Sequence, residues 1–487
     1  MKKIYFITGS QDLYGDETLR QVAVDSKEMA SFLNAKLNSK VEIVWKPTVR
    51  NPQEIADVCV EASTDKECVA VITWMHTFSP AKMWIKGLQL LTKPLMHLHT
   101  QANEKLPYDT IDMDFMNLNQ SAHGDREYGF ICSRLDIKRE VVVGYYKHQA
   151  VVDKISKFVD VALAQDFSKN LKVAMFGNNM REVAVTDGDR VESQIKFGWN
   201  VNYYGIGDLV DIANAATKAE IDAKMTAYQN EYEMNTTDLD AVKEQAKYEI
   251  ALEKFLKKGD FAAYTDTFQD LHGLKQLPGL ATQRMMAKGI GFGAEGDYKS
   301  AALNAVMCKM AEHREGSTGF MEDYTYELTP GEEVVLGAHM LEVSPDFASN
   351  KPKVEVHPLG IGDKEPPARL VFDGVQGDGI ACCLIDLGNR FRLVLAEIEL
   401  VKQPKAMPKL PTARLMWKLK PDFQTGAAGW LYAGGGHHTI VSTALTTDDM
   451  RLFAKLNDLE IVVIGEGTTL VALQKEIEIN NLISKLK

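Results

Sequence analysis

The stretch KIYFITGSQDLYG at residues 3–15 decides the fold that we expect of this chain. Its short apolar run passes directly into a glycine and a polar loop, and an amphipathic stretch follows at residues 17–37. The same alternation continues to residue 99, with further strands expected at residues 41–45, 68–75 and 94–99 and further helices at residues 52–63 and 81–91. Strands that alternate with helices in this way predict a parallel sheet with helices on both faces.

Polar loops follow three of these expected strands. They have the sequences GSQDLYG at residues 9–15, HTFSP at residues 76–80 and TQ at residues 100–101. Because the carboxyl ends of parallel strands meet at one edge of a sheet, these loops should lie close together there. The sequence therefore predicts a binding crevice at that edge.

The strand-and-helix pattern restarts after residue 170 and changes character near Thr318. A helix at residues 149–164 and a polar joint at residues 165–170 precede strands expected at residues 172–177, 201–204 and 262–268, with a long helix at residues 239–258. Beyond Thr318, alternating strands are expected at residues 321–328, 334–343, 353–356, 368–373, 379–387, 390–401 and 412–419. This second pattern predicts an antiparallel barrel or sandwich, closed by a helix at residues 447–455 and a strand at residues 460–465.

Composition narrows the class of partner and the compartment. The chain has 67 acidic and 55 basic residues, and no cluster of Lys and Arg suits nucleic acid or an anionic membrane. Its six cysteines are scattered without a Cys-x-x-Cys pair, as expected of reduced thiols in the cytoplasm. Apolar runs are far shorter than the about 20 residues that cross a bilayer, and the first residues enter a strand rather than a signal peptide. We expect a cytoplasmic protein that binds a small neutral molecule or another copy of itself.

A glycine pattern, Gly291-x-Gly293-x-x-Gly296, matches the dinucleotide-binding motif just before a helix expected from Tyr298. Glu295 lies inside this motif, where a pyrophosphate would meet a negative charge instead of backbone amides. We therefore expect no nucleotide cofactor. A carboxylate at a helix amino terminus stays ionised and makes a good metal ligand, although a simple helix-capping role fits the same position.

Two later strands carry polar side chains of interest. In residues 320–328, FMEDYTYEL, alternation places Glu322 on one face with Tyr324 and Tyr326, which fits either a binding face or a solvated edge strand. His339 lies in a mostly apolar strand, where a histidine is either a hydrogen-bonded core residue or a ligand.

The segment LYAGGGHHT at residues 431–439 brings two adjacent imidazoles onto a glycine-rich loop. Neighbouring side chains of an extended chain point in opposite directions, so only one of the pair should reach a given ion. The other would contact a ligand side chain or the substrate. Glu295, Glu322, His339 and His438 could together supply two carboxylates and two imidazoles, a set that suits Mn²⁺, Co²⁺ or Mg²⁺.

These segments together resemble the L-arabinose isomerase family over essentially the whole chain. The resemblance rests on GSQDLYG (9–15), WMHTFSPAKMW (74–84), IDMDFMNLNQ (111–120), NMREVAVTDGD (179–189), DLHGLKQLPGL (270–280) and the segments around Glu295, Glu322, His339 and the His437-His438 pair. It implies two Rossmann-like, doubly wound parallel-sheet domains at residues 1–169 and 170–317, followed by a mainly antiparallel β-barrel domain at residues 318–487.

The resemblance also implies an activity and a set of site residues. The expected reaction is the isomerisation of L-arabinose to L-ribulose, and also of D-galactose to D-tagatose, as the first step of L-arabinose catabolism. It implies a Mn²⁺ site made by Glu295, Glu322, His339 and His438, in a homohexamer whose sites a neighbouring subunit completes. The residues implied to contact the substrate are Gln11, Leu13, His123, Met180, Phe268, Tyr324, Ile361 and His437.

Aldose-to-ketose conversion explains why such residues would be needed. The C2 proton is weakly acidic until the neighbouring carbonyl is polarised, which a divalent cation can do. Glu295 and Glu322 are then the expected base and acid in either order, and His123 or His437 the expected acid for ring opening. A direct hydride shift is the alternative route. Rival functions are isomerisation of another aldose, such as L-fucose, and a sugar-binding module without turnover.

Overall fold

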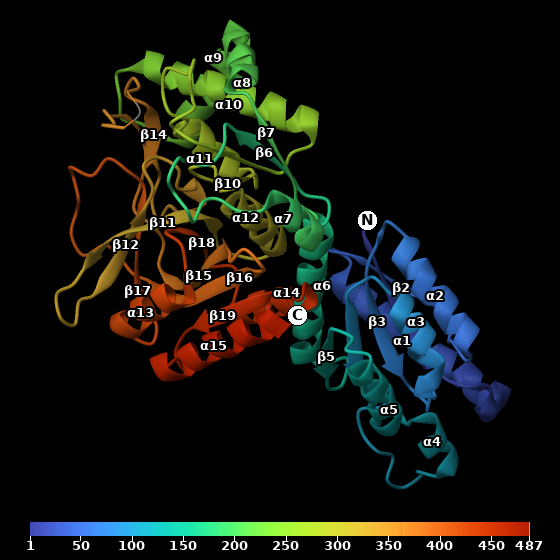
Figure 1. Cartoon of the computed structure of the whole chain (residues 1–487). Coiled ribbons are helices and arrows are strands. Elements are labelled where there is room, and N and C mark those ends of the chain that lie inside the picture. Colours follow the sequence, from blue (N-terminus) through green and yellow to red (C-terminus); the bar gives the residue numbers. More distant parts are fainter. Residues whose placement is uncertain (362, 487) are drawn as a thin grey trace. The chain divides into compact units, whose positions relative to one another are not determined.

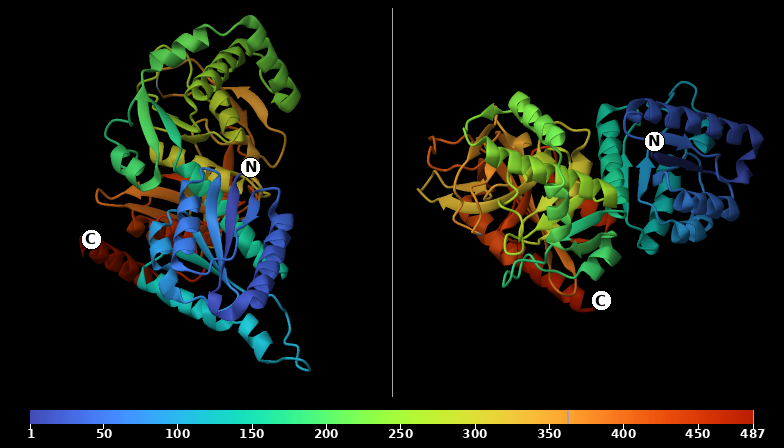
Figure 2. Two further views of the ribbon diagram at one scale, coloured as in Figure 1. Left: turned by 90° about the vertical axis from the view of Figure 1, so that its right-hand side faces the viewer. Right: turned by 90° about the horizontal axis from the view of Figure 1, so that it is seen from above.

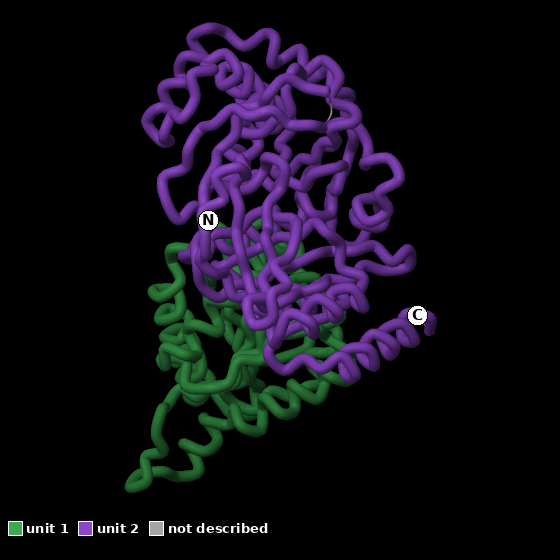
Figure 3. The backbone as a smooth tube through the Cα atoms, turned by 90° about the vertical axis from the view of Figure 1, so that its left-hand side faces the viewer, with its two compact units in different colours: residues 1–166 green, residues 167–487 purple. Residues whose placement is uncertain are grey.

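The computed structural model describes residues 1–361 and 363–486 and divides into two compact units. Unit 1 comprises Met1–Asp166 and unit 2 comprises Phe167–Lys487, which Figure 3 distinguishes by colour. Among the described residues, every helix is too short or too polar to span a membrane. The division of the chain into three domains stays a prediction, because the compact units are two.

Unit 1 is built on five parallel strands in the order β2-β1-β3-β4-β5 (Figure 1). The strands are β1 (Lys3–Gly9), β2 (Glu42–Trp45), β3 (Cys68–Met75), β4 (Leu95–His99) and β5 (Arg139–Val143). The helices are α1 (Gly15–Leu37), α2 (Pro52–Thr64), α3 (Ile85–Leu90), α4 (Met113–Leu118), α5 (Ser121–Arg134) and α6 (Gln149–Ser168). Every residue of β3 is buried, as expected of a central parallel strand with helices on both faces. The predicted parallel sheet is confirmed, and β5 adds an edge strand that was not predicted.

The winding of this sheet creates a crevice. The chain passes from β1 to β2 on one side and then to β3 on the other side of β1, so the connections diverge between β1 and β3. Ligands of doubly wound sheets bind outside the carboxyl ends of the strands at such a point. The helix predicted at residues 81–91 begins as a 3-10 turn (Ala81–Trp84) and becomes α-helical only from Ile85.

The first part of unit 2 repeats the architecture. Its four parallel strands are ordered β10-β9-β6-β7, with β6 (Lys172–Phe176), β7 (Asn200–Tyr204), β9 (Ala263–Asp266) and β10 (Gly291–Gly293). The helices are α7 (Arg190–Phe197), α8 (Ile206–Asn214), α9 (Lys218–Glu231), α10 (Leu239–Gly259), α11 (Leu280–Ala287) and α12 (Tyr298–Ala311). The predicted second α/β sheet is confirmed.

The rest of unit 2 contains a closed barrel. Six antiparallel strands follow the order β15-β18-β11-β12-β17-β16, and pairing of β15 with β16 closes the ring. These strands are β11 (Thr318–Glu327), β12 (Val334–Ala338), β15 (Gly377–Asp386), β16 (Phe391–Leu400), β17 (Arg414–Leu419) and β18 (His438–Ser442). Strand β19 (Glu460–Ile464) joins β16 in parallel. This part of the chain is therefore a barrel and not a sandwich.

Helices α13 (Phe423–Ala433), α14 (Thr447–Leu456) and α15 (Leu470–Leu486) complete unit 2. Figure 2 shows α15 (red) at the periphery of this unit, where the described chain ends. The sequence predicted α14 and β19 but neither α13 nor α15.

Two predicted barrel strands lie elsewhere. Strands β13 (Lys353–Val356) and β14 (Ala368–Val371) form a separate small sheet with β8 (Glu233–Met234). Val354 and Leu370 bury their side chains in a core that includes Tyr228 and Val242 of helices α9 and α10. The hairpin therefore covers helices, and the prediction that it belongs to the barrel was wrong.

Candidate active site

The carboxyl edge of the second parallel sheet positions three of the predicted site residues. Met180 follows β6, Phe268 follows β9 and Glu295 follows β10, so all three lie where these parallel strands end. The backbone N–H of Met180 donates to the carbonyl of Glu295 at 2.8 Å, which joins two of these loops directly. Because the chain diverges from β6 toward β7 and β9, this edge has the geometry of a ligand site.

The turn that carries Glu295 is tight and strained. Glu295 has a φ of 60°, a left-handed conformation that a residue other than glycine adopts only when its surroundings impose it. The glycines around it serve close packing, since a Cβ on Gly293 would lie 2.4 Å from the carbonyl oxygen of Asp297. Asp297 is the residue whose side chain caps α12, by accepting from the N–H of Ser300 at 3.1 Å. The capping role considered for Glu295 therefore belongs to Asp297.

Barrel register brings the other predicted ligands together. On β11, Glu322 pairs with His438 of β18 on one side and with Ala338 of β12 on the other, and His339 follows Ala338 directly. Strand β11 pairs with β18 over residues 318–322 and with β12 over residues 322–327, so it has strand partners on both sides only at Glu322. Its exposed end beyond Glu322 pairs on one side, as the alternative of a solvated edge strand expects. The strand predicted through residue 343 ends at Ala338, so His339 is the first residue after the strand and not a residue within it.

A bulge on β11 decides which tyrosine reaches the site. The pairing with β12 skips Tyr324, between Asp323 and Thr325. Tyr324 borders the same cavity as Glu322, whereas Tyr326 lies past the bulge with its ring 5.0 Å from that of Phe423. Only one of the two tyrosines predicted to share a face with Glu322 therefore borders the site.

Four predicted ligands converge in space. One side-chain atom each from Glu295, His339 and His438 lie within 4.8 Å of one another. Glu322 is next to them, with its Oε2 at 3.9 Å from Nε2 of His339. Nε2 of His437 lies 3.5 Å from Oε2 of Glu295, so the second imidazole of the pair contacts a member of the cluster.

Two buried carboxylates orient the two imidazoles. Nδ1 of His339 donates to Glu342, and Nδ1 of His438 donates to Asp297 at 3.2 Å. An ionised carboxylate only accepts hydrogen bonds, so each Nδ1 carries the proton and each Nε2 presents its lone pair. Nε2 of His438 is buried and has no hydrogen-bond partner among the described residues. A buried acceptor without a partner fits a ligand that is held there by that nitrogen.

The charges of the site follow from burial and from these contacts. Burial opposes the ionisation of Glu295, but its hydrogen bond with His437 lowers its pKa overall. Burial likewise opposes the ionisation of Asp297, yet Lys299 and His438 hold its pKa well below the usual range. Burial lowers the pKa of His438, which favours the neutral, ligating imidazole.

A cavity of about 230 Å³ opens beside this cluster. Its lining includes the predicted residues Met180, Phe268, Glu295, Glu322, Tyr324, His339 and Ile361. Gln11, Leu13 and His123 belong to unit 1.

Two of these unit 1 residues, Gln11 and His123, contact Phe78. Nε2 of Gln11 donates to the Phe78 carbonyl at 3.0 Å, and the ring of His123 lies 4.7 Å from the Phe78 ring. Leu13 is 82% exposed, so nothing within unit 1 covers it. These contacts lie at the crevice outside β1 and β3, and Phe78 is a member that the sequence did not single out.

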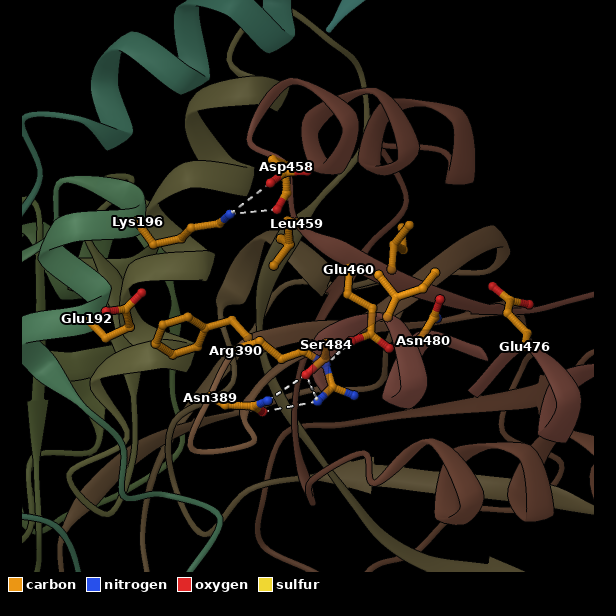
Figure 4. Close-up of a pocket in the computed structure, with 13 residues that line it drawn as sticks. Glu192, Lys196, Asn389, Arg390, Asp458, Leu459, Glu460, Glu476, Asn480 and Ser484 are labelled. Atoms are coloured by element: carbon orange, nitrogen blue, oxygen red, sulfur yellow. Dashed lines mark hydrogen bonds and ion pairs between the residues drawn. The ribbon is translucent and has the colours of Figure 1, made fainter. Parts of the chain in front are cut away.

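A second cavity of unit 2, of about 390 Å³, differs in chemistry (Figure 4). Several of its charged side chains already have partners in the protein. Lys196 donates to the Asp458 carbonyl, and Nε of Arg390 donates to Glu460. We therefore assign the functional site to the cavity beside Glu295 and His438.

Comparison with known proteins gives one consistent result. Family models of the L-arabinose isomerase N-terminal, central and C-terminal domains match residues 1–170, 172–313 and 317–460. L-arabinose isomerases of Geobacillus stearothermophilus and Anoxybacillus flavithermus are each 51% identical to the chain over 486 residues. These matches cover 99% of this chain, 98% of the Geobacillus protein and 97% of the Anoxybacillus protein. The L-arabinose isomerase of Halalkalibacterium halodurans is 49% identical, over 99% of this chain and 98% of its own.

The chain belongs to the L-arabinose isomerase family. It is therefore an enzyme of the aldose-ketose isomerase class. A periplasmic sugar-binding protein from Legionella pneumophila covers 64% of the chain and 96% of its own length, but its TM-score of 0.15 and 9% identity are too low to bear on fold or function.

Sequence reasoning missed two residues of this isomerase site, Asp297 and Glu342. Each orients an imidazole, and Asp297 does so across 141 residues of sequence from His438, a separation that no local pattern reveals. A signal for Asp297 existed, since an Asp three residues before a Ser at a helix start is a typical cap. Glu342 follows His339 by three residues in an apolar segment, where a buried carboxylate needs a partner.

Proposed function

We propose that this chain converts L-arabinose to L-ribulose with a divalent metal ion, Mn²⁺ in the first place, held by Glu295, Glu322, His339 and His438. Co²⁺ or Mg²⁺ would suit the same donors. The observation that carries the proposal is the convergence of these side chains on a buried imidazole nitrogen that has no hydrogen-bond partner among the described residues. They come from β11, β18, the residue after β12 and the β10–α12 turn. A bound divalent ion would polarise the sugar carbonyl and align O1 with O2.

The two glutamates are the groups that we propose to move protons. One takes the proton from C2 and the other delivers a proton to C1, by way of an enediol. Glu295 is fixed by His437 and His438, whereas Glu322 sits on a barrel strand 3.9 Å from His339, so the two approach the site from different elements. Solvent deuterium is expected at C1 of the product, and its complete absence would favour a direct hydride shift instead.

The decisive assay is ketose formation from L-arabinose by chelated enzyme, with and without added Mn²⁺. Glu322→Gln should lose turnover by several orders of magnitude in the presence of Mn²⁺. Glu327→Gln is the matched control, because Glu327 is an exposed residue of the same strand. A turnover rate that changes neither on chelation nor in Glu322→Gln would exclude the proposed reaction. D-galactose in the same assay tests the conversion to D-tagatose, and L-fucose tests the rival isomerase.

The unit 1 residues lead to a proposal on assembly. We propose a homohexamer in which Gln11, Leu13 and His123 of a neighbouring subunit complete each site, with His123 assisting ring opening. Family membership and the exposed Leu13 support this assignment. Refolding inactive His123→Ala together with inactive Glu295→Gln should restore about one quarter of the activity, because that fraction of sites then has both intact halves. No recovery in proven mixed oligomers would contradict it.

We also propose that the enzyme acts in the cytoplasm as the first step of L-arabinose catabolism. All six cysteines are free, which suits a reducing compartment.

A further inference from the structure

Asp266 borders the cavity from a position that the fold holds rigidly. It is the last residue of β9 and pairs with Phe176 of β6, at the point where the chain connections diverge. Its backbone carbonyl accepts from the N–H of Gly296 at 2.9 Å, which ties it to the turn that carries Glu295. The backbone of Asp266 therefore keeps a fixed place relative to the turn that carries Glu295.

The carboxyl group of Asp266 stands apart from the other three that line the cavity. Glu342 holds His339, Glu295 faces the two adjacent imidazoles, and Glu322 faces His339. No hydrogen bond or ion pair joins the Asp266 carboxyl to any residue within 1–361 and 363–486. Burial first, and then the charge of Glu342, raise its pKa to about 7, while the nearby His339 lowers it only in part, as expected of a carboxyl in a confined cavity without a hydrogen-bonding partner.

Such a group needs an external partner. An unpaired polar group in an apolar setting is unfavourable unless something hydrogen-bonds to it, and native structures contain few of them. Most of the remaining cavity wall is apolar and comprises Met180, Phe268, Leu271, Leu277, Pro278, Ala294, Met340 and Ile361. An aldose carries a hydroxyl group on nearly every carbon, and the metal cluster can serve only those nearest the reacting carbons. A hydroxyl beyond C2 would otherwise meet this apolar wall.

We propose that Asp266 hydrogen-bonds a sugar hydroxyl beyond C2 and thereby selects which aldose the enzyme turns over. This assignment rests on the proposed function and deepens it. A site built to hydrogen-bond a substrate hydroxyl discriminates strongly against an analogue that lacks it, because the protein group is then left unpaired. The other polar group of this part of the wall, the Tyr324 hydroxyl, faces the sulfur of Met340 at 3.8 Å.

The test compares wild type, Asp266→Ala and Asp266→Asn on L-arabinose and on its 3-deoxy, 4-deoxy and 5-deoxy analogues. Asp266→Ala should lower kcat/KM for L-arabinose about tenfold to a hundredfold, and Asp266→Asn, which keeps an acceptor, should lose less. One deoxy analogue should be a poor substrate of wild type yet equal L-arabinose as a substrate of Asp266→Ala. An equal penalty for every analogue in both enzymes would overturn the proposal.

Two further measurements separate this role from a structural or metal-binding one. Mn²⁺ affinity, measured by electron paramagnetic resonance, should change less than about twofold in Asp266→Ala, since a direct hydrogen bond to sugar does not touch the ion. A larger loss would assign Asp266 to the metal site and overturn the proposal. Asp211→Ala is the matched control, because Asp211 is an exposed carboxylate on helix α8 of the same unit.

The failure of the proposed function would be recognised separately. If wild type with Mn²⁺ forms no ketose from any aldose, the reaction is wrong, and calorimetry with L-arabitol, an open-chain polyol, then decides on Asp266. Weaker L-arabitol binding by Asp266→Ala than by Asp211→Ala would support the hydroxyl contact. Equal binding by the two variants would refute it.

Discussion

Glu249 on helix α10 is the buried anion on which the packing of three helices depends. Its fully buried carboxylate accepts from Lys224 of α9 at 2.8 Å, from Nε of Arg284 of α11 at 2.8 Å and from Lys288 at 2.6 Å. Tyr228 donates to it as well, at 2.6 Å. Burial opposes its ionisation, but the charges of Arg284, Lys288 and Lys224 lower its pKa from 4.5 to about 2.

Replacing Glu249 by glutamine should therefore destabilise unit 2 by about 3 kcal/mol. A pKa lowered by this amount corresponds to about 3 kcal/mol of folding free energy at neutral pH. The figure agrees with the cost of about 3–5 kcal/mol for removing one partner of a buried ion pair, since the cations would face a neutral amide. Glu253→Gln is the control, because Glu253 contacts Lys224 and Lys288 from a partly exposed position and should cost less than about 1 kcal/mol.

Urea unfolding between pH 7 and pH 2 tests both size and sign. The folded-state pKa of Glu249 lies below its unfolded value, so its contribution is complete above about pH 4.5 and disappears as the pH falls through about 2. The stability gap between wild type and Glu249→Gln should accordingly shrink over this window. Hydrogen exchange of the α10 amides reports the same gap locally. A gap that does not change with pH, or one below about 1 kcal/mol at pH 7, would refute the reasoning.

Three further outcomes are expected. His438→Ala should abolish saturable Mn²⁺ binding and the rise in Tm that Mn²⁺ gives wild type; retained binding would remove His438 from the site. Glu342→Leu, which takes away the acceptor of Nδ1 of His339, should weaken Mn²⁺ binding about 10- to 100-fold in the same titration, and an unchanged affinity would contradict its orienting role. Gly293→Ala sets a methyl group 2.4 Å from the Asp297 carbonyl oxygen, so Tm and turnover should fall together, and normal values of both would show that the close packing is dispensable.

The sequence predicts the parallel sheets well because their signal is local. Buried strands such as β3 and amphipathic helices such as α1 have periodicities that survive in any tertiary context. Which sheet a strand joins is a different matter, and the β13–β14 hairpin shows why. Its alternation is the same whether its apolar face packs in the barrel or against α9 and α10, so only the folded chain decides.

The sequence predicts which residue types form the candidate site, but it predicts the neighbouring residues that hold or surround them less well. Glu295, Glu322, His339 and His438 are identified by residue type and family resemblance, and the structure brings them together, whereas their role as ligands stays a prediction. Asp266 escaped notice because an acid at a strand end is ordinary in sequence. That its carboxyl has no partner among residues 1–361 and 363–486 is visible only in the folded cavity.

The closed barrel has a consequence for the choice of ion. Glu322, His339 and His438 belong to three adjoining strands, or directly follow one, and interstrand hydrogen bonds keep neighbouring strands about 4.8 Å apart. In a closed ring of strands without a free edge, the spacing between strands can change little when an ion binds. Of the four proposed ligands, only Glu295 is carried by an element outside the barrel. A proposed ion of a different radius would therefore have to displace this tightly packed, strained turn.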